Sequence, residues 1–180
     1  MKVALVYPHL KGNWLGCYPP LSLLYLATSL KMAGQEIKIF DRDWGPFTVQ
    51  QLAFQVIQFK PDLIGLPSLS TTLPELFLLF SILRKQCTKA TFVIGGHHAS
   101  AMPDRVLEEF SGCEYVLIGE AEESLVKLCN VLEEGGSIDY SCSQDSDCDN
   151  GRCIDNRCVK GEIEIENNID IIAWIISFIK

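Results

Sequence analysis

Five short loops of this 180-residue chain are rich in Gly, Ser, Thr and His, residue types that suit contact with a large ligand. Glycines let the backbone approach a flat or phosphate-bearing molecule closely, and hydroxyl and imidazole groups can hydrogen-bond to it. The positions of interest are His9, Gly12, Asp41, Ser68, Ser70, Thr71, Gly95, Gly96, His98, Gly119 and Glu120. Helix capping accounts for some of the hydroxyls but not for the Gly-Gly pair. The loops therefore indicate a binding site.

A second group of reactive residues is a cysteine quartet near the C-terminal end. It comprises Cys142, Cys148, Cys153 and Cys158, in a stretch rich in Asp, Asn, Ser and Gly that cannot build a core of its own. Two disulfides are narrowly favoured, although a cytosolic chain argues against them. Zinc is the second interpretation, because the four-residue gaps lie at the edge of the usual ligand spacing. Calcium is the third, since acids alternate at 145, 147 and 149 but the expected Gly and Glu are out of place.

The elements that must position the five loops follow an alternating pattern typical of βαβ units and a parallel sheet. Apolar runs predict strands over 3–7, 36–40, 63–66, 91–94 and 115–118. Helical periodicity predicts helices over 21–33, 48–59, 74–85, 103–110 and 122–134. We therefore predict an α/β fold, a doubly wound parallel sheet of five strands in the order 2-1-3-4-5. In such sheets, ligands bind beyond the carboxyl ends of the strands, where the five loops would meet.

Composition divides the chain and excludes some partners. Its 15 basic and 23 acidic residues give a net charge of −8, which would repel a nucleic-acid backbone. No apolar run is long enough for a membrane span, and residues 1–9 lack a signal-peptide core, so we expect a cytoplasmic protein. A domain boundary is predicted at 135–136. It would separate the α/β domain (1–135) from a small, acidic Cys-rich appendage (136–180).

The last twenty residues of the sequence carry two further patterns. Residues 162–166 alternate Glu and Ile, as in a strand with one buried face. Residues 169–179 are almost entirely apolar but too short to cross a bilayer. A helix docked on the α/β domain is favoured over a partner-binding segment or a surface anchor, because soluble monomers avoid large apolar patches.

Several short motifs, taken in order, resemble the cobalamin-binding domain found at the N-terminus of many radical-SAM enzymes. They are residues 18–27 with Gly34 beyond them, Asp41, residues 61–65, 68–72, 95–98 and 119–122. The resemblance implies a flavodoxin-like sheet, with the corrin over its carboxyl edge and the nucleotide tail beside it. It also implies that Ser68, Ser70 and Thr71 face the tail, that Gly95 and Gly96 let it pass, and that Gly119 and Glu120 border the pocket. Glu120 is equally well explained as an acid near a helix N-terminus, where the helix dipole stabilises a negative charge.

The resemblance has two departures. Cobalamin-dependent mutases carry D-x-H-x-x-G after the first strand, and here Tyr7 replaces the acid while His9 and Gly12 keep their spacing. His9 is thus a candidate cobalt ligand, although radical-SAM relatives usually leave that face of the cobalt free. His98 fits the histidine of the family's Gly-Gly-x-His pattern. In addition, residues 1–180 do not contain the C-x3-C-x2-C triplet that holds a radical-SAM cluster.

The sequence therefore predicts a cobalamin-binding module without a complete active site, acting with a radical-SAM domain or protein. Whether the chain takes part in catalysis is left open. The alternative is a flavodoxin-like or receiver-like interaction domain that binds no corrin. An enzyme with a nucleotide cofactor is disfavoured, because the first loop lacks G-x-G-x-x-G.

Overall fold

The computed structural model describes residues 1–8, 19–42, 48–135, 153–154 and 157–158. Five parallel strands form the main sheet: β1 (Lys2–Tyr7), β2 (Glu36–Asp41), β3 (Leu63–Pro67), β4 (Thr91–Gly95) and β5 (Tyr115–Val116). The helices are α1 (Leu21–Met32), α2 (Val49–Phe59), α3 (Leu73–Gln86), α4 (His97–Ala101), α5 (Pro103–Glu109) and α6 (Glu122–Glu133). The strand order, β2-β1-β3-β4-β5, is the one predicted.

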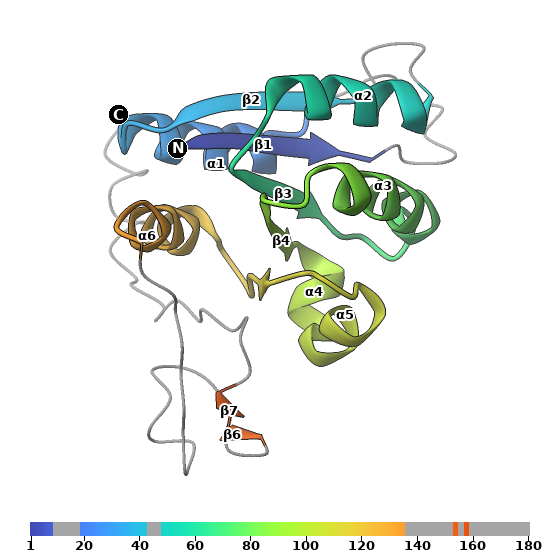
Figure 1. The fold of residues 1–180 in the computed structure, drawn as a ribbon. Helices are drawn as coiled ribbons and strands as arrows, with labels where there is room; N and C mark the ends of the chain where they lie inside the picture. Colours follow the sequence, from blue (N-terminus) through green and yellow to red (C-terminus); the bar gives the residue numbers. More distant parts are fainter. Residues whose placement is uncertain (9–18, 43–47, 136–152, 155–156, 159–180) are drawn as a thin grey trace, which may run out of the picture.

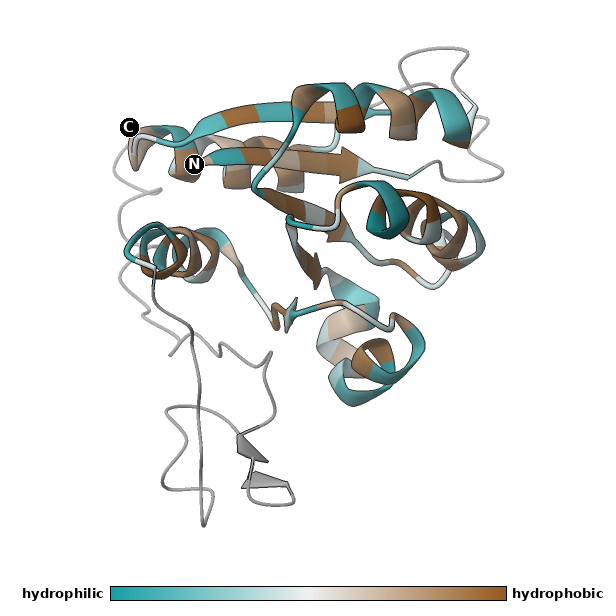
Figure 2. Ribbon diagram, in the orientation of Figure 1, coloured by the Kyte–Doolittle hydropathy of each residue, from teal (hydrophilic) through white to brown (hydrophobic). Residues whose placement is uncertain are grey.

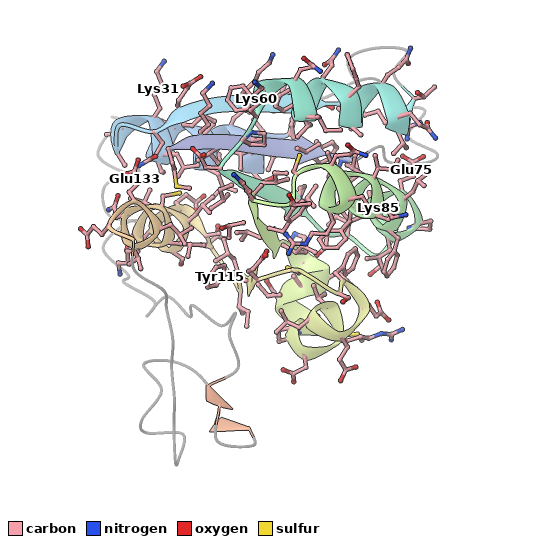
Figure 3. The ribbon with its side chains drawn as sticks, viewed as in Figure 1. Lys31, Lys60, Glu75, Lys85, Tyr115 and Glu133 are labelled. Carbon is pink, nitrogen blue, oxygen red and sulfur yellow. The ribbon has the colours of Figure 1, made fainter. Side chains whose placement is uncertain are left out.

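Helices cover both faces of the sheet, so the domain has three layers (Figure 1). One apolar cluster joins the sheet to α2, α3, α4 and α5, and a second joins the opposite face to α1 and α6. The central strands are apolar along their length (Figure 2), as expected for a sheet buried on both faces. Charged side chains such as Lys31 and Lys85 are exposed on the outside of the helices, and so is Lys60, directly after α2 (Figure 3).

Local signals in the sequence explain where the helices begin and end. Gly34 follows α1 at φ +86°, and the Gly34 and Gln35 amides donate to Lys31 and Leu30, which closes a Schellman turn. The Thr48 hydroxyl accepts from the Gln51 amide, and Gln51 accepts from the Thr48 amide, so α2 begins with a capping box.

Two predicted details are wrong. Residues 97–101 form the short helix α4, where the sequence predicted a loop, because tertiary hydrogen bonds described below hold this turn in place. The fifth strand is Tyr115–Val116 rather than 115–118, although the Leu117 amide still donates to the Ile94 carbonyl. The other predicted helices and strands agree with the structure to within one residue at each end.

The C-terminal predictions are largely outside the described residues. Cys153–Ile154 (β6) and Arg157–Cys158 (β7) form a two-stranded antiparallel ladder in which Cys153 stands opposite Cys158. The predicted boundary at 135–136, Cys142, Cys148, the strand at 162–166 and the helix at 169–179 are not covered by the description. They stay predictions.

Candidate functional site

A cavity of about 110 Å³ opens at the carboxyl edge of the sheet, on the face covered by α1 and α6. Its walls come from strands β1, β3 and β4, from the first turns of α1 and α6, and from residues 117–121 between β5 and α6. Four of the predicted site residues line it: Gly95, Gly96, Gly119 and Glu120. This is the edge where doubly wound sheets bind ligands.

Two strand glycines keep this cavity open. A Cβ atom at Gly65 would lie 2.8 Å from Leu5 Cδ2, and one at Gly95 would lie 3.6 Å from Leu117 Cβ. Leu5 and Leu117 are themselves walls of the cavity, so a side chain at either glycine would occupy space that a ligand needs. A glycine in the interior of a buried strand, such as Gly65, often marks a place where a ligand or another segment of backbone comes close to the strand.

Gly96 and Ser68 join the loop after β3 to the start of α4. Gly96 has φ +96° and ψ −177°, and a Cβ there would lie 2.9 Å from the Ser68 carbonyl oxygen. The Ser68 hydroxyl donates to the Gly95 carbonyl (2.8 Å) and accepts from the Ala99 amide (3.0 Å). The Ser68 amide also donates to Gly95, and the His98 amide to the Ser68 carbonyl. Ser68 is fully buried, so it positions the two loops.

Ser70, Thr71 and His98 lie at the same edge but outside the cavity walls. Ser70 and Thr71 are exposed, and the Ser70 hydroxyl is 3.4 Å from His98 Nδ1. The other ring nitrogen of His98, Nε2, is buried and has no hydrogen-bond partner among the described residues. A buried polar atom without a partner is costly, and a ligand or water would relieve that cost.

Asp41 ends β2 at the same edge, half-buried and away from the cavity walls. The next residue, Arg42, forms an ion pair with Glu75 in the first turn of α3, and its amide donates to the Tyr7 carbonyl. Glu75 is labelled in Figure 3. These contacts fix the outer end of the carboxyl edge.

The first turns of α1 and α6 face the mouth of the cavity, through Ser22, Leu23, Ala121 and Glu122. Within the described ranges, neither helix has a side-chain hydrogen bond at its N-cap. The first amides of a helix need partners outside the helix, and together with the helix dipole they favour an anion such as a phosphate.

The three described cysteines of the α/β domain are not activated. Cys87, Cys113 and Cys129 are free thiols, and burial raises the pKa of Cys113 to about 12 and that of Cys129 to about 11. The described part of the chain contains no cluster of three His, Cys, Asp or Glu residues that could hold a metal ion. His9 and Gly12 are outside the described residues, so their predicted roles stay predictions.

Sequence reasoning found the loops at this edge but missed most of the cavity walls. Besides Ser22, Gly65 and Glu122, the missed residues are apolar: Leu5, Leu23, Leu26, Leu66, Pro67, Val93, Leu117, Ala121 and Leu125. In the sequence they are indistinguishable from core residues, because the same side chains fill the interior of the sheet.

Comparison with known proteins identifies the family. Residues 10–129, well over half of the chain, match the profile of the B12 binding domain. The chain belongs to this family. The match starts one residue after His9 and includes all the cavity walls except Leu5. The predicted family and the predicted flavodoxin-like fold are both confirmed.

Curated relatives of this B12-binding domain are much longer proteins. The chain is 28% identical over 137 residues to an anaerobic magnesium-protoporphyrin IX monomethyl ester cyclase of Cereibacter sphaeroides, covering 74% of this chain and 22% of that protein. It is 26% identical over 120 residues to the uncharacterized methyltransferase PH0819 of Pyrococcus horikoshii, covering 67% of this chain and 26% of that one. The chain therefore spans about a quarter of the length of these relatives.

The structure is also similar to a solved cobalamin-dependent radical enzyme. The S-adenosylmethionine radical enzyme OxsB, with aqua-cobalamin and S-adenosylmethionine bound, superimposes with a TM-score of 0.68 at 19% identity, covering 98% of this chain and 25% of OxsB. At that identity the likeness supports the fold. No helix in the described ranges is long and apolar enough to cross a membrane.

Proposed function

We propose that this B12-binding domain binds cobalamin at the carboxyl edge of its sheet, with the nucleotide tail of the cofactor entering the cavity beside α1 and α6. The observation that carries the proposal is this apolar cavity, kept open by Gly65 and Gly95 at the carboxyl edge. When bound, cobalamin supplies a cobalt centre that can carry a methyl group or an electron. The chain's own residues bind the cofactor and orient it.

The residues at this edge fit the chemical groups of cobalamin. The apolar walls suit the aromatic base of the nucleotide, and the uncapped first turns of α1 and α6 suit its phosphodiester. Glu120 lines the mouth and is exposed, where its carboxylate can accept hydrogen bonds from amide side chains of the corrin. His98, with Ser70 beside it, offers a ring nitrogen that has no partner in the described part of the chain. His9 is the proposed cobalt ligand.

The reaction served by the cofactor is a further part of the proposal. Two features support a role beside a radical-SAM domain or protein. The domain has the fold of one quarter of OxsB, a cobalamin-dependent radical enzyme, and the curated relatives extend well beyond the matched region. We propose that this domain carries the cofactor for such a partner.

Retention of hydroxocobalamin tests the binding proposal. Purified protein is mixed with the cofactor and desalted, and the corrin absorbance per mole of protein is measured. We expect close to one bound corrin per chain. A colourless protein would reject the proposal and favour an interaction domain of the same fold.

Two tryptophan variants of α1 test where the tail binds. Leu26→Trp places a large ring in the cavity wall, whereas Leu24→Trp makes the same change on the same helix at a position that is 41% exposed and outside the walls. Leu26→Trp should retain much less cobalamin and Leu24→Trp as much as the wild type. Equal retention by both variants would show that the tail lies elsewhere.

Two histidine variants test the edge beyond the cavity. His98→Ala should weaken cobalamin retention because it removes the half-buried ring that carries the buried Nε2, whereas His97→Ala alters its exposed neighbour and should not. His9→Ala tests the cobalt ligand separately, because loss of a nitrogen ligand changes the spectrum of bound cobalamin. An unchanged spectrum with full retention would rule out ligation by His9.

A further inference from the structure

We propose that the cavity selects among corrinoid cofactors by their lower base. It should accept a base whose six-membered ring is apolar, such as a benzimidazole, and should disfavour a purine. The inference rests on the proposed function, since it assumes that the nucleotide tail enters this cavity. It goes further because it assigns a chemical class of cofactor to the site.

The interior of the cavity has apolar side chains. Its buried walls are Leu5, Leu23, Gly65, Leu66, Val93, Leu117 and Leu125. The polar side chains in the walls are those of Ser22, Glu120 and Glu122, of which Ser22 and Glu120 are exposed and Glu122 is half-buried. Polar groups are therefore confined to the mouth, and the interior offers a base no polar side chain among the described residues.

Several backbone groups around the cavity are already in use. The Gly95 carbonyl already accepts from both the amide and the hydroxyl of Ser68, at 2.7 and 2.8 Å. The Gly119 amide donates to the Ser100 hydroxyl, and the Ala121 carbonyl accepts from Leu125. Pro67 has no amide hydrogen to donate. Apart from the first amides of α1 and α6 at the mouth, a polar ring entering this space would find few partners.

The two classes of base differ in the ring that would occupy this interior. Benzimidazole and purine bases share a five-membered ring with two nitrogens, through which they are joined to the ribose. The six-membered ring of a dimethylbenzimidazole carries carbon and methyl groups alone. That of adenine carries two ring nitrogens and an exocyclic amine, all hydrogen-bonded to water before binding. Burying a polar group without a new partner is unfavourable, whereas burying methyl groups is favourable.

The size of the cavity fits one ring rather than a whole nucleotide. An apolar protein cavity of roughly 150 Å³ binds benzene. The present cavity, at about 110 Å³ and open at the carboxyl edge, can take most of a six-membered ring while the rest of the tail extends toward the mouth. The discrimination therefore falls on the ring in which the two bases differ.

Competition between three corrinoids tests the inference. Retention and dissociation constants are measured for cobalamin, for the cobamide with adenine as lower base, and for cobinamide, which lacks the nucleotide. We expect adeninylcobamide to bind roughly 5- to 150-fold more weakly than cobalamin, the range that corresponds to one unsatisfied buried polar group. Cobinamide should also bind more weakly than cobalamin.

The outcomes separate the inference from the proposed function. Equal binding of cobalamin and adeninylcobamide would overturn the inference and leave cobalamin binding intact. Cobinamide binding as tightly as cobalamin would overturn it too, because the tail would then contribute nothing. If no corrinoid binds, the proposed function fails and the inference fails with it.

A matched pair of variants places the selectivity in the cavity. Val93→Thr puts a hydroxyl of nearly the same shape in the buried wall, and Val116→Thr makes the same change in β5 on the opposite face of the sheet. Val93→Thr should reduce the preference for cobalamin over adeninylcobamide several-fold, because the hydroxyl can pair with the purine ring. Val116→Thr should leave the preference unchanged. Equal preferences in all three proteins would contradict the assignment, and circular dichroism checks that each variant folds.

Discussion

Replacing Gly96 with alanine should destabilise the domain far more than the same change at another glycine with positive φ. At φ +96° and ψ −177°, Gly96 lies in a backbone region that is nearly restricted to glycine. A new Cβ would also lie 2.9 Å from the carbonyl oxygen of Ser68 and 3.1 Å from its amide nitrogen. Those atoms are backbone and cannot rotate away.

Two terms give the size of the effect. Backbone strain at such a position costs about 1–3 kcal/mol. Moving the Ser68 backbone to relieve the overlap costs about 1–3 kcal/mol more, as for other overpacked sites. Gly34→Ala is the matched control, because Gly34 has φ +86° but no atom within 4 Å of the new Cβ. Only strain of about 1–2 kcal/mol applies there.

Urea unfolding followed by circular dichroism measures the difference. With a slope of about 2 kcal/mol per molar urea, the midpoint of Gly96→Ala should fall below that of Gly34→Ala by about 0.5–1.5 M. Similar midpoints for the two variants would refute the argument, since the contact with Ser68 would then cost nothing.

Three further predictions concern groups away from the cavity. Ser68→Ala should lower the free energy of unfolding by about 1–3 kcal/mol in urea titrations, because it leaves buried backbone groups without the hydroxyl. Cys113 and Cys129, with raised pKa values, should resist iodoacetamide at pH 8 in peptide mapping, and the free energy of unfolding should fall as the pH rises from 9 toward 11, because the unfolded thiols ionise first. Glu114→Gln removes the charge that faces Arg84 at 3.0 Å; since both side chains are about one third exposed, the loss should stay below about 1 kcal/mol and shrink in high salt.

The regular elements were predictable because their signals are local. Gly34 ends α1, Thr48 begins α2, and unbroken apolar runs mark strands buried on both faces. Helix α4 was not predictable in this way. Its five residues are too few to show a helical period, and the turn depends on hydrogen bonds from His98 and Ala99 to Ser68, thirty residues earlier.

The site was predictable only where its residues carry a local signal in the sequence. Gly95, Gly96, Gly119 and Glu120 stand out in loops, and they do line the cavity. Ser68 was expected to face the ligand, a role that stays a prediction, and in the structure its hydroxyl is occupied by backbone groups. The apolar walls could not be separated from the core, because a cavity is a property of how the layers fit together rather than of any residue type.

The bonds between Ser68 and its neighbours have a consequence for how this edge can change. They hold the loop after β3 and the start of α4 by backbone atoms and one inward hydroxyl, without using the exposed side chains of Ser70, Thr71 or His97. Those three positions are free to vary while the course of the chain stays the same. Substitutions at these three positions, in homologues or in a mutant library, can therefore change the contacts of the outer rim while the backbone keeps its course. Residues 68 and 96, in contrast, tolerate few substitutions.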